Sequence, residues 1–379
     1  MAADIEIRQV TTRGERAAFV KLPWRVYAGD HNWVPPLISD QMVTLDPKKS
    51  EFFKHADVAL FSAYQGGKVA GTIATFIDHQ MIQRNGQPEG GFGFFEVIDD
   101  YQVFSVLMDA ACDWQRHKGI KAMSGPTSFT ENDNPGVLVE GADCPPAMLE
   151  AHTPPYYKDF LERYGMQKYH DLFAWRAHRD LVGEGLKNLP PDILRVAEMA
   201  KKAARVNIRK LRMEYWDQEI ATAVNLFNAT LSQLPTYQPM DLEHFRKLAD
   251  KLKMLVDPDM ALFAEVGGKP VGFIVAIPDI NRLLMHLNGH LFPFNWLRVR
   301  RWIKQIDVVS FKLMGLLEEY RHRGIDAMLY LETVKAFYNK GYTWIDGSVT
   351  SEYNPAVNLL PTRVGAERYK HYRIYQIKL

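Results

Sequence analysis

Apolar residues recur along the chain with two periods, and the order of these periods predicts the elements of the fold. Residues 59–78 and 261–279 read ALFSAYQGGKVAGTIATFID and ALFAEVGGKPVGFIVAIPD. Each is a pair of apolar runs joined by Gly-Gly-Lys, which is typical of a β-hairpin. Helical spacing follows in VFSVLMDAACDWQRH (103–117) and AMLYLETVKAFYN (327–339), so a helix is expected after each hairpin.

These segments belong to an internal repeat. KGIKAMSGPTSFTENDNP (118–135) matches KGYTWIDGSVTSEYNP (340–355): each has Lys-Gly, a second Gly, a Thr/Ser-rich stretch, a Glu and Asn-Pro. A weaker pair is RYGMQKYH (163–170) and RVGAERYKH (363–371). Because the order is kept in all three pairs, the chain is predicted to contain two copies of one domain.

The repeated order of hairpin, strand, helix and strand predicts an α/β fold in each half. We expect two tandem domains, each with a mixed, mostly antiparallel twisted sheet flanked by helices and one parallel crossover. At 379 residues the chain is also too long for one ordinary core. LVGEGLKNLPPDI (181–193) interrupts the pattern, so the predicted domains are residues 1–185 and 190–379.

Composition narrows the class of protein. The formal net charge of +1, from 46 Lys and Arg against 45 Asp and Glu, disfavours a nucleic-acid partner. The two cysteines, Cys112 and Cys144, indicate a reducing compartment rather than a disulfide framework. The sequence has no apolar run of about 18 residues and no signal peptide, so a cytoplasmic location is expected. A peripheral position at the inner membrane face is the alternative.

The most informative segment is EEYRHRGID (318–326). It follows the apolar, β-rich run IDVVSFKLMGLL (306–317), and helical spacing begins near Ile325. A strand-to-helix turn exposes backbone N–H groups to an anion. Gly324 would allow close approach of a phosphate, while Arg321 and Arg323 would supply charge. A helix start with solvated charges is the alternative interpretation.

GLLEEYRHRGIDAML (315–329), GYTWIDGSVTSEYNPAV (341–357) and a late Gly resemble the acyl-CoA motif of the GCN5-related N-acetyltransferase (GNAT) superfamily. The family's turn reads Gln/Arg-x-x-Gly-x-Gly/Ala, and Asp326 departs from it. The resemblance implies that the turn holds the CoA pyrophosphate and that the preceding strand holds pantetheine. The implied cofactor-binding residues are Met314, Leu316, Leu317, Arg321, His322, Arg323, Gly324, Ile325, Asp326 and Asn354. The co-substrate would be acyl-CoA, either acetyl-CoA or a long-chain acyl-CoA, with no metal.

The resemblance covers nearly the whole chain. At the turn, RHRGID (321–326) aligns with DDYQVF (99–104) in the first half, which pairs Gly324 with Gln102. The first-half stretch is acidic, so no cofactor is expected there. The segments at 22–37 (LPWRVYAGDHNWVPPL), 91–100 and 125–141 are similar to a bacterial GNAT-like subgroup. That subgroup includes the bacterial ceramide synthases, which acylate a sphingoid amine from a long-chain acyl thioester.

Acyl transfer to an amine needs a base, a polarised carbonyl and a proton for the leaving thiolate. Glu352, after the second-half strand, is the favoured base, with a solvated loop carboxylate as the alternative interpretation. A backbone N–H near Leu316 or Leu317 would polarise the carbonyl. The family's usual acid is a Tyr four residues before the late Gly, where this chain has Pro361. Tyr353 or water would take its place.

Two further segments suggest the acceptor. The polar cluster TENDN and the following HTPPYY predict an acceptor site or plain turns, and the candidate residues are Glu131, Asn132, Asp133, Asn134, His152 and Tyr156. The basic, Trp-bearing insert 282–304 fits a membrane surface or an interface helix. We therefore predict long-chain N-acylation of a lipid-like amine such as a sphingoid base. The alternatives are acetylation of a small polar amine and a non-catalytic acyl-CoA- or partner-binding module.

Overall fold

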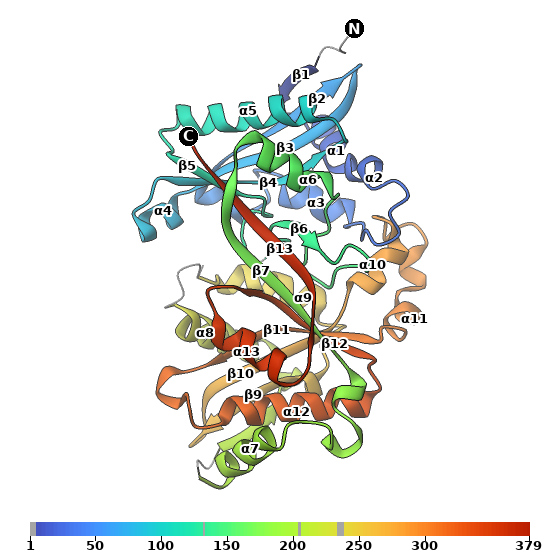
Figure 1. The fold of residues 1–379 in the computed structure, drawn as a ribbon. Helices are drawn as coiled ribbons and strands as arrows, with labels where there is room; N and C mark the ends of the chain where they lie inside the picture. Colours follow the sequence, from blue (N-terminus) through green and yellow to red (C-terminus); the bar gives the residue numbers. More distant parts are fainter. Residues whose placement is uncertain (1–4, 132, 204–205, 233–238) are drawn as a thin grey trace. The chain divides into compact units, whose positions relative to one another are not determined.

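A computed structural model describes residues 5–131, 133–203, 206–232 and 239–379 (Figure 1). By its contacts the chain divides into two compact units. The first comprises the chain up to Phe173, Asn281–Val299 and Tyr369–Leu379, and the second comprises Ala174–Ile280 and Arg300–Arg368. The units therefore do not follow chain order, because the last strand of the protein belongs to the first unit. The domain limits predicted from the repeat do not include this exchange.

The first unit is a mixed sheet with helices packed on it. Its strands run in the order β1-β2-β3-β4-β5-β13, and β6 pairs with β13. The strands are β1 (Ile5–Gln9), β2 (Ala56–Gln65), β3 (Lys68–Asp78), β4 (Glu89–Val97), β5 (Ala122–Gly125), β6 (Val137–Glu140) and β13 (Glu367–Lys378). Strand β7 (Gln167–His178) begins in this unit and ends in the second. The helices are α1 (Arg13–Lys21), α2 (Pro23–Val26), α3 (Ile38–Thr44), α4 (His79–Asn85), α5 (Tyr101–His117), α6 (Tyr156–Tyr164) and α10 (Asn281–Leu287).

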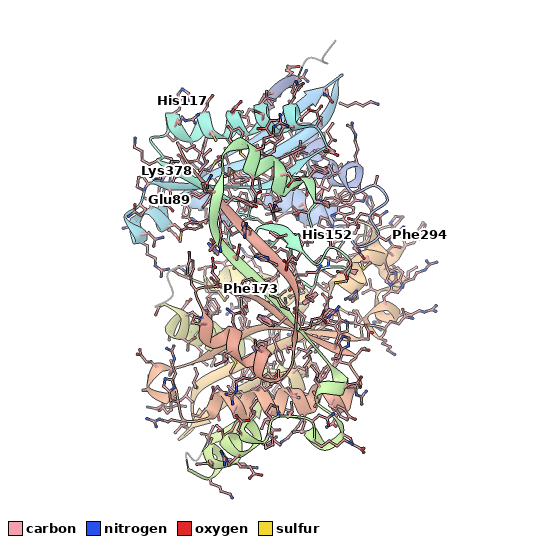
Figure 2. The ribbon with its side chains drawn as sticks, in the orientation of Figure 1. Glu89, His117, His152, Phe173, Phe294 and Lys378 are labelled. Carbon is pink, nitrogen blue, oxygen red and sulfur yellow. The ribbon has the colours of Figure 1, made fainter. Side chains whose placement is uncertain are left out.

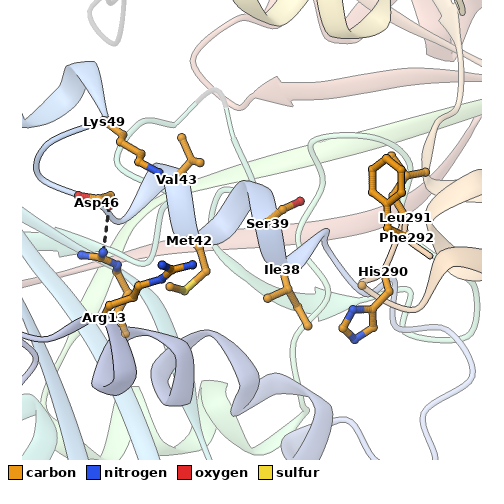
Figure 3. Close-up of a pocket in the computed structure, with 12 residues that line it drawn as sticks. Arg13, Ile38, Ser39, Met42, Val43, Asp46, Lys49, His290, Leu291 and Phe292 are labelled. Atoms are coloured by element: carbon orange, nitrogen blue, oxygen red, sulfur yellow. Dashed lines mark hydrogen bonds and ion pairs between the residues drawn. The ribbon is translucent and has the colours of Figure 1, made fainter. Parts of the chain in front are cut away.

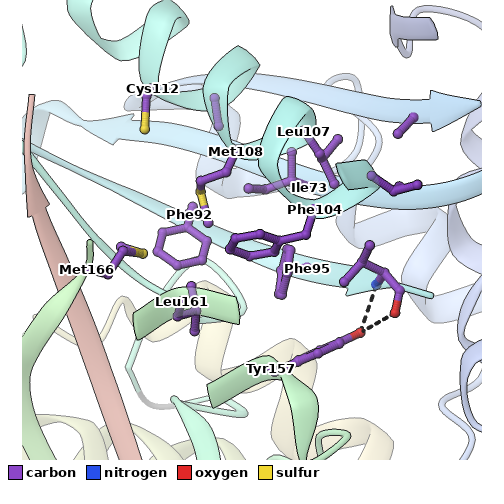
Figure 4. Packing of buried hydrophobic residues seen from close by; sticks show 14 of the residues in the cluster. Ile73, Phe92, Phe95, Phe104, Leu107, Met108, Cys112, Tyr157, Leu161 and Met166 are labelled. Carbon is purple, nitrogen blue, oxygen red and sulfur yellow. Dashed lines mark hydrogen bonds between the residues drawn. The ribbon is translucent and has the colours of Figure 1, made fainter. Parts of the chain in front are cut away.

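The core of the first unit lies between its sheet and α5. Apolar residues of α5 recur on one face, where Phe104, Leu107 and Met108 are fully buried. They pack against Ile73 and Phe92 of the sheet, as Figure 4 shows. Burying side chains of this size stabilises the unit by roughly 1.5–3 kcal/mol each. The predicted helix after the first hairpin is thus present, and its apolar stripe explains its position.

The second unit repeats this plan. Its strands run in the order β12-β11-β10-β9-β8. They are β8 (Val206–Lys210), β9 (Ala261–Val266), β10 (Lys269–Pro278), β11 (Val308–Leu316) and β12 (Trp344–Ser351). The helices are α7 (Pro191–Ala203), α8 (Trp216–Leu231), α9 (Leu242–Leu252), α11 (Val299–Ile303), α12 (Ile325–Lys340) and α13 (Pro355–Arg363). Within this unit α7 packs on α12, and α8 contacts β10 and β11 (Figure 1).

Both units contain one parallel strand pair joined by a helix, as the repeat predicts. In the first, Glu89–Gly91 of β4 pairs with Ala122–Ser124 of β5 across α5. In the second, Val308–Ser310 of β11 pairs with Trp344–Asp346 of β12 across α12. Among the described residues the β11–β12 ladder stops there although both strands continue, so the strands part. We call the space between 311–316 and 347–351 the splay.

The insert 282–304 does not form one amphipathic helix. It contains the end of α10, a 3-10 turn at Asn295–Leu297 and α11. Pro293 and Gly289 interrupt the helical backbone, because proline removes an N–H donor and Gly289 adopts a positive φ of 80°. The insert is therefore a short helix followed by a loop that presents its apolar side chains at the surface.

Candidate active site

The turn between β11 and α12 leads into a helix whose first backbone N–H groups have no side-chain cap among the described residues. Gly324 is the N-cap of α12, has a left-handed φ of 75°, and offers no side chain to the first helical amides. No other side chain caps these amides within the part of the chain that the structure describes. Asp326 is exposed in the first turn rather than at the cap. The helix N-terminus therefore keeps the donors and partial positive charge that favour an anion.

The corresponding helix of the first unit is capped by its own carboxylate. Asp100 is the N-cap of α5, and its Oδ1 accepts hydrogen bonds from the N–H groups of Gln102 (2.9 Å) and Val103 (3.4 Å). The two N-caps show that Gly324 corresponds to Asp100, whereas the sequence alignment paired Gly324 with Gln102. A carboxylate thus occupies the donors in the first unit that remain available in the second.

The two turns also differ in length. Residues 98–99 separate β4 from the cap in the first unit, whereas residues 317–323 separate β11 from the cap in the second. The turn of the second unit is therefore five residues longer than that of the first, with seven residues instead of two. They include Arg321, His322 and Arg323, and His322 adopts a positive φ of 60°, which is unusual for a residue with a side chain.

Arg321 and Gly324 have contacts that serve the fold. The Arg321 guanidinium donates to the carbonyl oxygens of Leu316 (3.2 Å) and Thr230 (2.9 Å), which ties the turn to α8. A Cβ on Gly324 would lie 2.9–3.0 Å from Val196 and Ala200 of α7. His322 and Arg323 are exposed, and Ile325 is buried. Of the three basic side chains, His322 and Arg323 are thus the more accessible to an anion in solution.

Backbone alternation shows which amides of β11 face the splay. The Leu317 N–H donates to the Val271 carbonyl at 2.9 Å, toward β10. Because successive residues of a strand direct their N–H groups to opposite sides, the amides of Leu316 and Met314 face the splay. Leu316 is therefore the better of the two predicted carbonyl-polarising positions, since the Leu317 amide is occupied. Met314, on the same strand, is exposed.

In the first unit the equivalent space is filled by the unit's own chain. The Tyr157 hydroxyl accepts from the Val97 N–H at 2.8 Å (Figure 4). The Tyr156 hydroxyl donates to the Val97 carbonyl at 2.7 Å. Val97 corresponds to Leu316, because they pair with Gly71 and Gly272 of the repeated hairpins. Thr127 also donates its N–H to the Phe92 carbonyl at 3.0 Å. Tyr156, a predicted substrate residue, thus completes the fold of the first unit.

The residues after β12 form a loop that starts α13. Asn354 accepts weakly through its side chain from the Val357 N–H at 3.4 Å. Ser351 accepts from the Tyr353 N–H at 3.2 Å. Glu352 is partly buried, and Tyr353 is 61% exposed. Their predicted roles as base and acid remain predictions, because no substrate position is defined in the structure.

The predicted acceptor residues lie in separate polar contacts of the first unit. Glu131 Oε2 lies 3.3 Å from His170 Nε2, and His152 Nε2 lies 2.7 Å from Asp30 Oδ2. The Asn134 amide donates to Asp133, and burial raises the pKa of Asp133 to about 6. Asn132 lies outside the described residues. None of these contacts of the described residues joins the cluster at 131–134 to His152, so a shared acceptor site stays a prediction.

The carboxyl of Glu96 is a feature that the sequence analysis does not single out. Tyr157 donates to Glu96 Oε2 at 2.8 Å, and Tyr27 donates to Oε1 at 3.3 Å. Burial raises the pKa of Glu96 to about 8, although both hydroxyls act in the opposite direction. Glu96 is partly exposed by surface area but has no neighbouring cation among these contacts. This raised pKa predicts a protonated carboxyl at neutral pH.

A second feature absent from the sequence analysis is an open cavity of about 770 Å³ in the first unit (Figure 3). Its lining joins α1 and α3 to the loop after α10, and combines apolar side chains with a few charges: Arg13, Arg16, Ile38, Ser39, Met42, Val43, Asp46, Lys49, Gly289, His290, Leu291 and Phe292. Its volume lies within the range of small-molecule sites. In the described parts of the chain, no cluster of three His, Cys, Asp or Glu residues is arranged to hold a metal.

Solved structures share this architecture of two units. A tandem GNAT protein from the clavulanic acid biosynthesis pathway superposes with a TM-score of 0.57, covering 99% of this chain and 98% of its own, at 12% identity. A GCN5-related N-acetyltransferase from Sphaerobacter thermophilus has a TM-score of 0.51, with 99% and 95% covered, at 11% identity. The fold is therefore that of a tandem GNAT protein, which confirms the predicted fold class.

Two curated proteins are similar over their whole length, while no family model matches the chain. The bacterial ceramide synthase of Caulobacter vibrioides is 34% identical over 384 residues, covering 99% of this chain and 97% of that protein. Protein YghO of Escherichia coli is 31% identical over 377 residues, covering 98% and 94%. The chain belongs to the family of the bacterial ceramide synthase within the GNAT superfamily, and it is an N-acyltransferase.

Proposed function

We propose that the second unit binds a long-chain acyl-CoA and that the protein transfers its acyl group to the amine of a lipid-like acceptor such as a sphingoid base. The contrast between the two equivalent helix starts carries the proposal. In the first unit Asp100 occupies the amides of α5, whereas α12 begins at Gly324 without a side-chain cap. The pyrophosphate would take the place that the carboxylate holds in the first unit.

The remaining cofactor assignments follow from this position. Arg323 and His322 would contact the phosphates, and the amides of Leu316 and Met314 would bind pantetheine and the thioester oxygen in the splay. Asn354 and Glu352 would lie at the far side of the splay, with Glu352 as the base. Chain length and acceptor are suggested by the name of the Caulobacter vibrioides relative. The apolar cavity and the apolar loop after α10 also suit a lipid substrate.

Charge reversal in the turn tests the cofactor site. We expect His322→Glu with Arg323→Glu to weaken palmitoyl-CoA binding by roughly 100-fold, because two hydrogen-bond donors, one of them a charged guanidinium, are replaced by carboxylates that repel the phosphates. Both side chains are exposed, so the fold should persist. Arg321 is left unchanged because it holds the carbonyls of Leu316 and Thr230. Titration calorimetry measures the effect.

The matched control is Lys335→Glu, which reverses a charge at an exposed position on α12. Its surface ion pair with Glu332 contributes little, so affinity should be unchanged. Wild-type affinity in the double variant would contradict the site. Equal affinity of wild type for acetyl-CoA and free CoA would instead favour acetylation of a small polar amine.

The loop after α10 is proposed to contact a membrane that carries the acceptor. Phe292, Phe294, Trp296 and Leu297 are 69%, 74%, 50% and 63% exposed, and Phe294 projects from the surface in Figure 2. The exposed Arg298, Arg300, Arg301 and Lys304 follow in sequence. Aromatic side chains beside basic ones are the composition of an interfacial anchor. Among the described residues, no helix has the length and apolar character needed to cross a bilayer.

Replacing Phe294, Trp296 and Leu297 with Ser should lower binding to phosphatidylglycerol vesicles by roughly 1,000-fold or more, because each of the three side chains contributes about 1.5–3 kcal/mol when buried. Co-sedimentation of protein with vesicles measures this. Met199→Ser is the control, since Met199 is equally exposed, at 62%, on α7. Undiminished sedimentation of the triple variant would contradict membrane contact through this loop.

A further inference from the structure

A buried ion pair closes the inner end of the splay in the second unit. Lys312 Nζ lies 3.3 Å from Asp346 Oδ2 and 3.2 Å from the Ser348 hydroxyl. The Lys312 side chain is 6% exposed and that of Asp346 is 0% exposed. Lys312 belongs to β11, while Asp346 and Ser348 belong to β12, so the pair bridges the two strands where they part. None of the roles derived above uses these residues.

A β-bulge brings Lys312 into this position. Val275 of β10 pairs with Leu313, and the next residue, Ala276, pairs with Phe311, which leaves Lys312 as the extra residue. A bulge bends the strand and redirects a side chain that regular alternation would place elsewhere. Ser348, opposite, adopts a positive φ of 62°, and its N–H donates to Asp346 Oδ1 at 3.1 Å. Irregular backbone on both strands thus supports the pair.

The equivalent strands of the first unit, β4 and β5, lack the Lys–Asp pair. Gly91 and Ser124 form the last parallel pair there, in the places of Ser310 and Asp346. The first unit has its bulge one step further along, between Thr72 and Ala74 of β3. Because 91–97 and 310–316 are equally long, Gly93, which has no side chain, takes the position of Lys312 counted from the last parallel pair. The unit whose helix is capped by its own carboxylate is therefore also the unit without the Lys–Asp pair.

Stability does not explain the pair. Two charges in a low-dielectric interior lose their hydration, and apolar residues of similar volume are often equally stabilising. The surrounding positions of β11 and β12, Val309 and Ile345, are apolar and buried. A charged pair in this apolar setting is consistent with a chemical role.

The hydrogen bonds leave the lysine able to act as a proton donor. Asp346 accepts from the Ser310 hydroxyl, the Lys312 ammonium and the Ser348 amide, so its carboxylate is a well-satisfied counter-ion. An ammonium group carries three donor protons. The bonds to Asp346 and Ser348 use two, which leaves a third for a group in the splay. Lys312 is also two residues from Met314, whose amide faces the same space.

We infer that Lys312, held by Asp346 and Ser348, is the general acid that protonates the leaving CoA thiolate. The inference rests on the proposed function and supplies the acid that Pro361 removes from the family's usual position. The free amine of the acceptor attacks the thioester carbonyl, and a C–N bond forms. The tetrahedral intermediate then collapses, the C–S bond breaks, and the sulfur takes a proton from Lys312. Glu352, the proposed base, takes the proton lost by the acceptor nitrogen, and solvent carries a proton from Glu352 back to Lys312, so the net products are the amide and CoA thiol.

Lys312→Arg separates proton transfer from charge and packing. Arginine keeps the cation and its bond to Asp346 but does not release a proton at any pH compatible with a folded protein. We expect palmitoyl-CoA affinity within about threefold of wild type and a fall in kcat of about 10²–10⁴-fold, the usual contribution of a general acid. Lys312→Met should lose as much. The assay uses palmitoyl-CoA with sphinganine, and acetyl-CoA with ethanolamine.

Lys340→Arg is the control, because Lys340 of the same unit also contacts two other residues: its Nζ lies 2.7 Å from Asp257 Oδ2 and 2.8 Å from Asp259 Oδ2. It should keep wild-type kcat. If Lys312→Arg retains kcat, the pair is structural and the inference fails, even where Lys312→Met does not fold. Absence of turnover by wild type with both substrate pairs would instead overturn the proposed function, and the inference with it.

Discussion

Glu96→Gln should make the protein more stable at pH 8 and leave its stability nearly unchanged at pH 4. The Glu96 carboxyl has a pKa of about 8 in the folded protein, against an ordinary value of 4.5. Between these values the unfolded chain loses the proton and the folded chain keeps it, so wild-type stability falls as pH rises from about 4.5 to 8. Glutamine carries no ionisable proton and removes this dependence.

The full pKa shift would make the unfolding free energy of Glu96→Gln larger than that of wild type by about 5 kcal/mol at pH 8, since one pKa unit corresponds to about 1.4 kcal/mol. Because Glu96 keeps some exposure to solvent, we expect roughly half of this at pH 8. Urea unfolding of both proteins at pH 4, 6 and 8 gives the comparison, in which other titrating groups cancel. A constant difference across this range would contradict a proton held at Glu96.

Gly93→Ala should destabilise the first unit by about 3 kcal/mol, because its Cβ would lie 1.4 Å from the Thr127 carbonyl oxygen. This oxygen belongs to the chain after β5, which packs on β4 where the second unit has its splay. A backbone atom cannot move aside as a flexible side chain can. Urea unfolding, followed by the midpoint at constant slope, measures the loss.

Gly14→Ala is the matched control. Gly14 lies in α1 and has no described atom within 4 Å of an added Cβ. Alanine is the better helix former by about 0.8–1 kcal/mol, so this variant should be unchanged or slightly more stable. Equal stability of Gly93→Ala and wild type would mean that the first unit's space is open, and the contrast between the two units would be lost.

The repeat and the GNAT resemblance predicted the fold class from sequence because they depend on local patterns. Gly-Gly-Lys hairpins and the helices before Lys-Gly appear where those patterns place them. The exchange of β13 into the first unit is not a local property, since it depends on which sheet edge the last strand joins. The alignment of the two turns was shifted by two residues, because helix caps rather than residue identity fix that register.

The site was predicted only in part, for a similar reason. The turn 318–326 could be predicted as a candidate phosphate site because its glycine and arginines match the spacing of the GNAT motif. Lys312 could not, because its position depends on a bulge that adds one residue to a strand. In the sequence, Asp346 and Glu96 are indistinguishable from other polar residues of strands, because only the structure shows their burial and their hydrogen-bond partners. Charge and the GNAT motif together assign Arg321 to phosphate, and its bonds to two carbonyls are visible only in the folded turn.

The most direct measurement is turnover by the purified protein with palmitoyl-CoA and sphinganine, followed by thiol release and by mass spectrometry of the product. The account predicts N-palmitoyl sphinganine in an amount equal to the CoA thiol released, and its loss in the His322→Glu and Arg323→Glu double variant. Thiol release without amide, or amide formation that survives the double variant, would contradict acyl transfer from CoA bound at the start of α12.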